Sequence, residues 1–212
     1  AHADSHAVQR LFTSFLKRHE EPRAGIISLG GVDLMGVAVH ELRQEVIVLD
    51  RPNVTEMSIR EYLQLSDQSG SPEAILEALA AVGLEDAVSQ LPEGLDTNLA
   101  VTGWPLSITE TMQLKLAAAI ISRPRLLVLN QLYDVMSAEE LKASLELLQS
   151  GRPVTVMYFS NRECELDFDC FIDMHSSEQP IFEDYEAFSE EVESWQRGRI
   201  ARTPTLAAGG ES

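Results

Sequence analysis

The stretch Leu91–Gln131 decides the fold and reads LPEGLDTNLAVTGWPLSITETMQLKLAAAIISRPRLLVLNQ. It predicts a helix that begins at Ser107, because a serine hydroxyl can cap the first turn and Glu110, three residues later, completes a capping box. Residues 112–121 give this helix a broad apolar face, as expected of a helix packed deep in a core. The helix is predicted to end at Arg123-Pro124.

A short apolar run, LLVL at residues 126–129, follows this helix. Its length and flanks are typical of a buried strand in a parallel sheet. Asn130 and Gln131 come directly after it, and open α/β sheets bind their ligands at the carboxyl ends of such strands. The stretch therefore indicates an α/β fold and a candidate site beside Asn130 and Gln131.

Hydrophobic periodicity predicts further elements on both sides of this stretch. Helices are expected at about 7–19, in two pieces over 58–88, at 138–149 and around 188–195. Strands are expected at 26–34, where a Gly-Gly turn interrupts the run, and at 45–49, 154–160, 171–174 and 180–182.

The same stretch resembles the segment between the signature and Walker B motifs of ATP-binding cassette (ABC) ATPases, above all those of ABC exporters. The family has LP-x-G-x-DT, then LSGGQ, a helix, four apolar residues and Asp-Glu. The frame of this pattern is kept at Leu91, Pro92, Gly94, Asp96, Thr97, Leu106, Ser107, Pro124 and the LLVL run. The likeness continues, in order and with family-like spacing, from about residue 7 to about residue 190.

The resemblance implies an ABC-type, RecA-like fold, in which a mostly parallel sheet is flanked by helices and carries an inserted helical subdomain. Residues 1–55 are then the start of the RecA-like core, 56–105 the helical subdomain, 106–200 the signature helix and the rest of the core, and 201–212 a disordered tail. The family's first central strand and β-lobe have no counterpart in the sequence. We therefore expect the chain to be part of a longer polypeptide.

In the family, a loop G-x-x-x-x-G-K-[ST] binds the nucleotide phosphates through backbone N–H groups and a lysine. The resemblance aligns Ser5, His6 and Val8 with this loop, but residues 3–9 read ADSHAVQ and contain neither glycine nor lysine. A histidine near a chain end, such as His6, is more often a solvated side chain than a phosphate contact.

The other nucleotide-site motifs of the family also align with changed residues. The glutamine after the second strand aligns with Asp50, which ahead of Arg51-Pro52 also has the character of an ordinary turn residue. Ser107 is kept in the signature motif, whose two glycines and glutamine align with Ile108, Thr109 and Glu110. The Walker B pair Asp-Glu aligns with Asn130 and Gln131. The switch histidine aligns with Asn161. The resemblance makes all these aligned residues vestigial nucleotide-binding positions, and no catalytic residue or metal ligand is predicted.

The composition excludes some classes of function. The chain has 34 acidic and 16 basic residues, a formal charge of −18, which argues against a nucleic-acid partner because such partners need a basic surface. No apolar run approaches the roughly 20 residues that cross a bilayer, so a membrane link is expected outside this chain. Cys164 and Cys170 could be a metal or redox pair, but C-x5-C is a poor zinc signature and free thiols are the better interpretation.

Phosphoryl transfer needs a phosphate cradle, a metal held by carboxylate and a positioned water, and each of these parts is replaced in the aligned motifs. We therefore predict a catalytically inactive ABC nucleotide-binding domain, not an enzyme and without cofactor where the family uses ATP and magnesium. Its role would be structural, dimerising or regulatory in an ABC transporter-like protein.

The expected partners are another ABC nucleotide-binding domain, in a homo- or heterodimer, and a transmembrane domain outside this chain, at the cytoplasmic face of the membrane. The alternative is a degenerate ATP-binding half of a working heterodimeric exporter. An enzyme of another class has only Asp134 and the two cysteines in its favour.

Overall fold

A computed structural model describes residues 6–66, 71–160, 166–174 and 179–202. The chain divides into two compact units, of which the larger contains residues 5–166 and the smaller contains the residues from 167 onwards. None of the described helices is both long and apolar enough to cross a bilayer.

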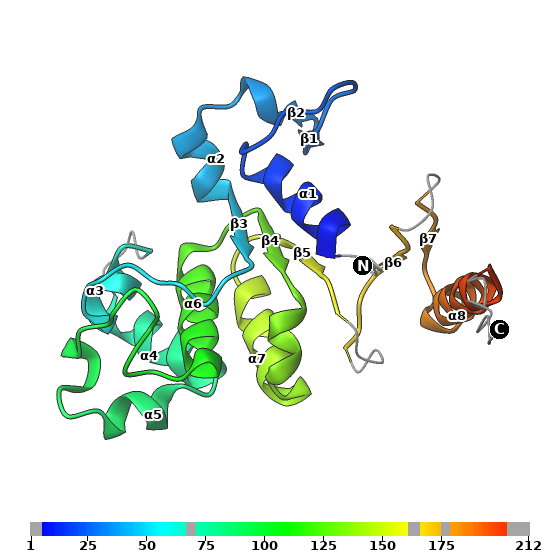
Figure 1. The fold of residues 1–212 in the computed structure, drawn as a ribbon. Helices are drawn as coiled ribbons and strands as arrows, with labels where there is room; N and C mark the ends of the chain where they lie inside the picture. The colour runs from blue at the N-terminus through cyan, green and yellow to red at the C-terminus, as the bar shows by residue number, and fades with distance from the viewer. Residues whose placement is uncertain (1–5, 67–70, 161–165, 175–178, 203–212) are drawn as a thin grey trace, which may run out of the picture. The chain divides into compact units, whose positions relative to one another are not determined.

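The centre of the larger unit is a parallel sheet of three strands in the order β3 (Val46–Leu49), β4 (Leu126–Leu129) and β5 (Thr155–Tyr158) (Figure 1). Strand β4 is buried along its whole length, as its LLVL sequence predicts. Leu49, Leu129 and Tyr158 lie opposite one another in the register. All three strands therefore end at the same level, and the residues that follow them share one carboxyl edge. The predicted α/β fold with a parallel sheet is confirmed.

Helix α1 (His6–Leu16) lies on one side of these strands, and α6 (Ile108–Ser122) and α7 (Ala138–Gln149) lie on the other (Figure 1). The capping box predicted for α6 is present, because Ser107 caps the helix and Glu110 bonds back to it. Helix α6 is buried on nearly all sides, which explains why its apolar residues form a broad face rather than a narrow stripe.

Between β3 and β4 the chain forms α3 (Ile59–Gln64), α4 (Pro72–Ala81), α5 (Glu85–Gln90) and the short 3-10 helix η2 (Gly94–Asp96). Helices α3 and α4 pack against α6. Their buried contacts come from fully or almost fully buried aliphatic side chains: Ile59, Leu63, Ile75 and Leu79. These helices lie within the range expected for a helical subdomain, and the boundaries of that subdomain stay a prediction.

Residues 26–45 differ from the sequence prediction. The strand and Gly-Gly turn expected at 26–34 form a hairpin of β1 (Ser28–Leu29) and β2 (Val32–Asp33), because Gly30 and Gly31 both adopt positive φ and reverse the chain in two residues. The 3-10 helix η1 (Leu34–Gly36) and helix α2 (Val39–Glu45) then lead into β3.

In the smaller unit, β6 (Phe171–Ile172) and β7 (Ile181–Phe182) form an antiparallel pair followed by helix α8 (Tyr185–Arg202). The ring of Phe171 lies 5.3 Å from that of Tyr185 and 5.5 Å from that of Phe188, measured between centroids. Helix α8 includes residues 201 and 202, and the remainder of the expected tail lies outside the described residues.

Candidate functional site

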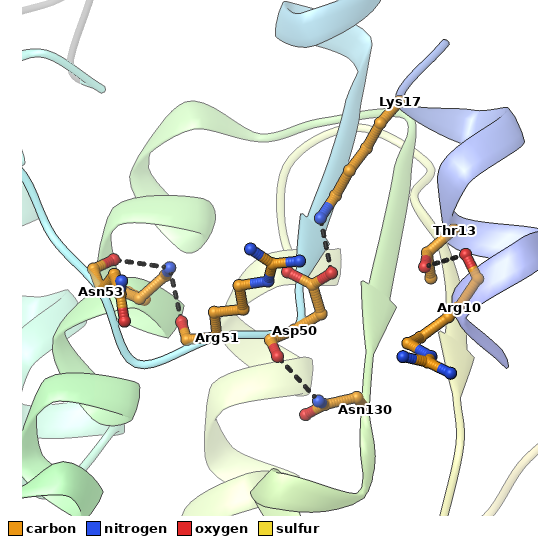
Figure 2. A network of polar contacts seen from close by, with 8 residues as sticks. Arg10, Thr13, Lys17, Asp50, Arg51, Asn53 and Asn130 are labelled. Atoms are coloured by element: carbon orange, nitrogen blue, oxygen red, sulfur yellow. Dashed lines mark hydrogen bonds and ion pairs between the residues drawn. The ribbon is translucent and has the colours of Figure 1, made fainter. Parts of the chain in front are cut away.

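The carboxyl edge of the parallel sheet brings Asp50, which follows β3, next to Asn130, which follows β4 (Figure 2). The Asn130 Nδ2 atom donates to the backbone oxygen of Asp50 at 3.1 Å. Its Oδ1 atom accepts from the backbone nitrogen of Leu132 at 3.1 Å and so caps the 3-10 helix η3 (Gln131–Val135). The side-chain amide thus joins the ends of two neighbouring strands.

Lys17, which follows helix α1, reaches the same edge. Its Nζ atom lies 2.5 Å from Asp50 Oδ2. The two side chains are 26% and 24% exposed, so the ion pair is mostly, but not fully, removed from water. This pair fixes the end of α1 to the end of β3.

Lys115 holds the segment after β3 from the other side of the sheet. From the middle of α6, its Nζ atom donates to the backbone oxygens of Arg51 at 2.7 Å and Asn53 at 2.9 Å. Burial lowers the pKa of Lys115, while the Asp50 carboxylate opposes this and the charges of Lys17 and Arg51 add to it. Asp50, Lys17 and Arg51 therefore all lie within electrostatic reach of Lys115.

Lys17, Arg51 and Lys115 form what we call the cation cluster. The chain contains three lysines in all, and two of them belong to this cluster. In Figure 2 the side chains of Lys17 and Arg51 point toward the Asp50 carboxylate. Three cations and one carboxylate leave a local positive charge in a chain whose formal charge is −18, and such a cluster can hold an anion.

The same edge does not fit a metal ion. The Asp50 carboxylate is paired with Lys17, and both ends of the Asn130 amide make hydrogen bonds within the chain. Across the part of the chain that the structure describes, no group of three or more His, Cys, Asp and Glu side chains is placed to bind a metal. The chemistry of the edge favours phosphate or another anion over magnesium.

Next to this edge, η3 is anchored by two buried tyrosines. The Tyr133 hydroxyl donates to the backbone oxygen of Met112 at 3.1 Å, and burial raises the pKa of Tyr133 well above its ordinary value. Asp134, a candidate for other chemistry in the sequence, accepts hydrogen bonds from Tyr158 Oη and, at 2.8 Å, from Ser160 Oγ. These bonds connect η3 to the end of β5.

The other predicted site residues are scattered. Ser5 and Asn161 lie outside the described residues, as does the side chain of His6, the first residue of α1; Val8 is half-buried in the same helix, and Gln131 begins η3. Ser107 and Glu110 bond to each other at the start of α6, with Ser107 N donating to Glu110 Oε2 at 2.7 Å. The roles of all these residues in nucleotide binding stay predictions.

Reasoning from the sequence missed Lys17 and Lys115. The family motifs do not include these positions, and the ion pair of Lys17 joins residues 33 apart in the chain. The available signal was the rarity of lysine, since a residue type that the chain otherwise avoids is informative where it occurs.

No protein-family model matches the chain. The chain is 27% identical over 146 residues to "ABC transporter B family member 2" of Dictyostelium discoideum. The aligned region covers 67% of this chain and 10% of that protein. It is 28% identical over 148 residues to the "ATP-dependent lipid A-core flippase" of Syntrophus aciditrophicus. The aligned region covers 68% of this chain and 25% of that protein.

Among solved structures, a bacterial Atm1-family ABC exporter with ATP bound matches with a TM-score of 0.77 at 17% identity, over 99% of this chain and 37% of that chain. The chain has the fold of this exporter structure and its curated relatives are ABC transporters, which confirms the resemblance seen in the sequence. The chain spans between a tenth and a quarter of the length of these curated relatives.

The prediction that the chain is not an enzyme is wrong. Its relatives are ABC transporters, which are ATP-hydrolysing enzymes, and one of them is named as ATP-dependent. The prediction followed from changed residues in one chain alone.

Proposed function

We propose that the chain is one nucleotide-binding half of an ABC exporter. It pairs with a second ABC nucleotide-binding domain and takes part in ATP-driven transport through a transmembrane domain outside this chain, at the cytoplasmic face of the membrane. The ABC exporter fold and the transporter relatives support this role.

The observation that carries the proposal is the cation cluster at the carboxyl edge of the parallel sheet. Lys17 pairs with Asp50 there, the Arg51 side chain points toward the same carboxylate (Figure 2), and Lys115 donates to the backbone oxygen of Arg51. Open α/β sheets bind ligands at this edge. A nucleotide carries its negative charge on its phosphates, and a cluster with more cations than carboxylates attracts that charge.

A partner of different sequence fits this chain better than a second copy. Two copies with a formal charge of −18 each repel one another on close approach. The described edge also has no free carboxylate to hold magnesium, because Asp50 is paired and residue 130 is an amide. A partner half with a magnesium-binding site of its own would complete the ATPase.

The test isolates the complete assembly from membranes by a tag on the protein that carries this chain. We expect the assembly to contain a second ABC nucleotide-binding domain and to hydrolyse ATP. We also expect 8-azido-ATP to label this chain on irradiation, with excess ATP preventing the labelling. An assembly without ATP hydrolysis, or without a second nucleotide-binding domain, contradicts the proposal.

A further inference from the structure

We propose that Lys17, together with Arg51, is the phosphate contact of this chain, and that the Asp50 carboxylate competes with the phosphate for the Lys17 ammonium. The assignment rests on the proposed function in taking a nucleotide phosphate as the ligand. It places the contact at residues that no family motif assigns, with Lys17 at the other end of α1 from His6.

The first step concerns the geometry of Lys17. An ammonium group has three donors. In the structure one of them is directed at Asp50 Oδ2, 2.5 Å away, and the side chain keeps 26% of its surface exposed. Lys17 can therefore meet an anion that arrives from solvent without leaving the edge of the sheet.

The second step concerns Arg51, whose backbone is fixed while its side chain is exposed. Lys115 binds the backbone oxygens of Arg51 and Asn53, and Asn130 binds that of Asp50. These bonds hold the segment from both sides, and the exposed guanidinium points to the same place as the Lys17 ammonium (Figure 2). A guanidinium offers paired donors that match phosphate oxygens.

The third step is the balance of charge. Lys17, Arg51 and Lys115 carry three positive charges, and Asp50 carries one negative charge. A phosphate that binds Lys17 must share it with the Asp50 carboxylate, which repels the phosphate at short range. Asp50 thus keeps Lys17 in place in the absence of ligand and lowers the affinity for an anion.

The competition predicts opposite effects for the two members of the ion pair. The full chain is titrated with magnesium-free tripolyphosphate, and separately with ATP, by isothermal titration calorimetry. We expect Lys17→Met to weaken tripolyphosphate binding by about tenfold. This is the change in dissociation constant that corresponds to the loss of one charge-assisted hydrogen bond. We expect Asp50→Asn to strengthen it, because the competing carboxylate is gone.

Lys142→Met is the matched control, because Lys142 is exposed on α7 and its loss changes the net charge by the same amount. Binding should be unchanged in this variant. Lys17→Arg should keep most of the affinity, since it keeps a cation at the edge. Circular dichroism and the thermal midpoint establish that each variant is folded, and if Lys17→Met is not, Lys17→Gln takes its place.

Three results with tripolyphosphate would each overturn the inference: equal losses in Lys17→Met and Lys142→Met, weaker binding in Asp50→Asn, or no binding to either the parent or Asp50→Asn. If ATP binds equally well to the parent and to Lys17→Met, the inference fails while the proposed function stands. If the isolated assembly does not hydrolyse ATP, the proposed function fails whatever the titrations show.

Discussion

Asn130 uses both ends of its side-chain amide at the carboxyl edge of the sheet. Its nitrogen donates to the backbone oxygen of Asp50, and its oxygen accepts from the backbone nitrogen of Leu132. An aspartate at this position could still cap η3, but it could not donate to Asp50. The amide is therefore adapted to joining two strands, which a carboxylate cannot do.

Asn130→Asp should accordingly lower the free energy of unfolding by about 1–2 kcal/mol, because it replaces a donor with a carboxylate that faces a carbonyl oxygen. Urea denaturation at neutral pH measures the effect. Asn53→Asp is the control, since Asn53 is exposed in the same segment and the change in charge is identical. Equal losses in the two variants would show that the added charge, and not the lost hydrogen bond, is responsible.

Tyr133 provides a prediction about pH. Burial raises its pKa well above the ordinary value, so the folded protein keeps the phenol protonated. The contribution of this group to stability is complete below the unfolded pKa of about 10, and it is lost as pH rises from there toward the folded pKa.

Tyr133→Phe removes the hydrogen bond to Met112 and should cost roughly 1 kcal/mol at pH 8. This cost should shrink above about pH 10. There the unfolded parent is stabilised by deprotonation of Tyr133, which lowers the parent's stability, and the Phe variant has no such group. Urea denaturation of both proteins at pH 8 and pH 10.5 gives the difference, in which the other tyrosines cancel. A cost that grows with pH would show that Tyr133 is not protonated in the folded state.

At the scale of elements, three helices begin with the same four-residue pattern. The boxes are Ser58 with Glu61 at α3, Ser107 with Glu110 at α6 and Ser137 with Glu140 at α7. Such a signal lies within one turn of chain, and this is why the start of α6 could be predicted from the sequence. The strand after α6 could be predicted from its own short apolar run, LLVL.

The contacts that build the candidate site lie far apart in the chain. The Lys17–Asp50 pair spans 33 residues and the Asn130–Asp50 bond spans 80. Sequence periodicity predicts which residues are buried in an element, but it does not say which side chains meet when distant elements pack. The ends of β3 and β4 were predicted to carry site residues, and only the structure joins them to Lys17 and Lys115.

The turn before α6 depends on one glycine. Gly103 has a φ of +90°, and a Cβ atom built on it would lie 2.1 Å from Thr111 Oγ1 and 2.7 Å from Thr111 Cγ2. Thr111 is buried and its hydroxyl donates to the backbone oxygen of Ser107, so it has little freedom to move away. The first turn of α6 thus packs directly against the backbone of the preceding loop.

Gly103→Ala should therefore lower the free energy of unfolding by roughly 3 kcal/mol, from a strained backbone and from overpacking against Thr111. Gly94→Ala is the control, because Gly94 has a φ of +55° but no atom within 4 Å of a built Cβ. It should cost about 1 kcal/mol, the backbone term alone. Thermal and urea denaturation compare the two variants. Similar losses of unfolding free energy would mean that the Thr111 side chain moves aside to accommodate the new methyl group.

At the scale of the whole molecule, the excess of acidic residues opposes compaction. The chain carries 34 acidic and 16 basic residues. Like charges repel over the surface of the folded protein, and dissolved salt screens this repulsion at separations beyond the Debye length, which is about 10 Å at 0.1 M.

The midpoint of thermal unfolding should therefore rise when sodium chloride is increased from 20 mM to 500 mM. Screening depends on ionic strength, so potassium chloride at the same concentrations should give the same rise. Differential scanning calorimetry measures both series. A falling midpoint would mean that attractive ion pairs, such as Lys17 with Asp50, outweigh the repulsion.

The in-register pairing of β3 with β4 has a consequence for how the protein is made. A ribosome releases Asp50 long before Asn130, its partner 80 residues later, and it synthesises all of α3 to α6 in the interval. Until residues 126–129 have been synthesised, β3 lacks its partner β4. Sheets whose contacts join such distant residues fold slowly and expose apolar surface while they do so. The edge that gathers the cation cluster can therefore form only after residue 130 has been synthesised.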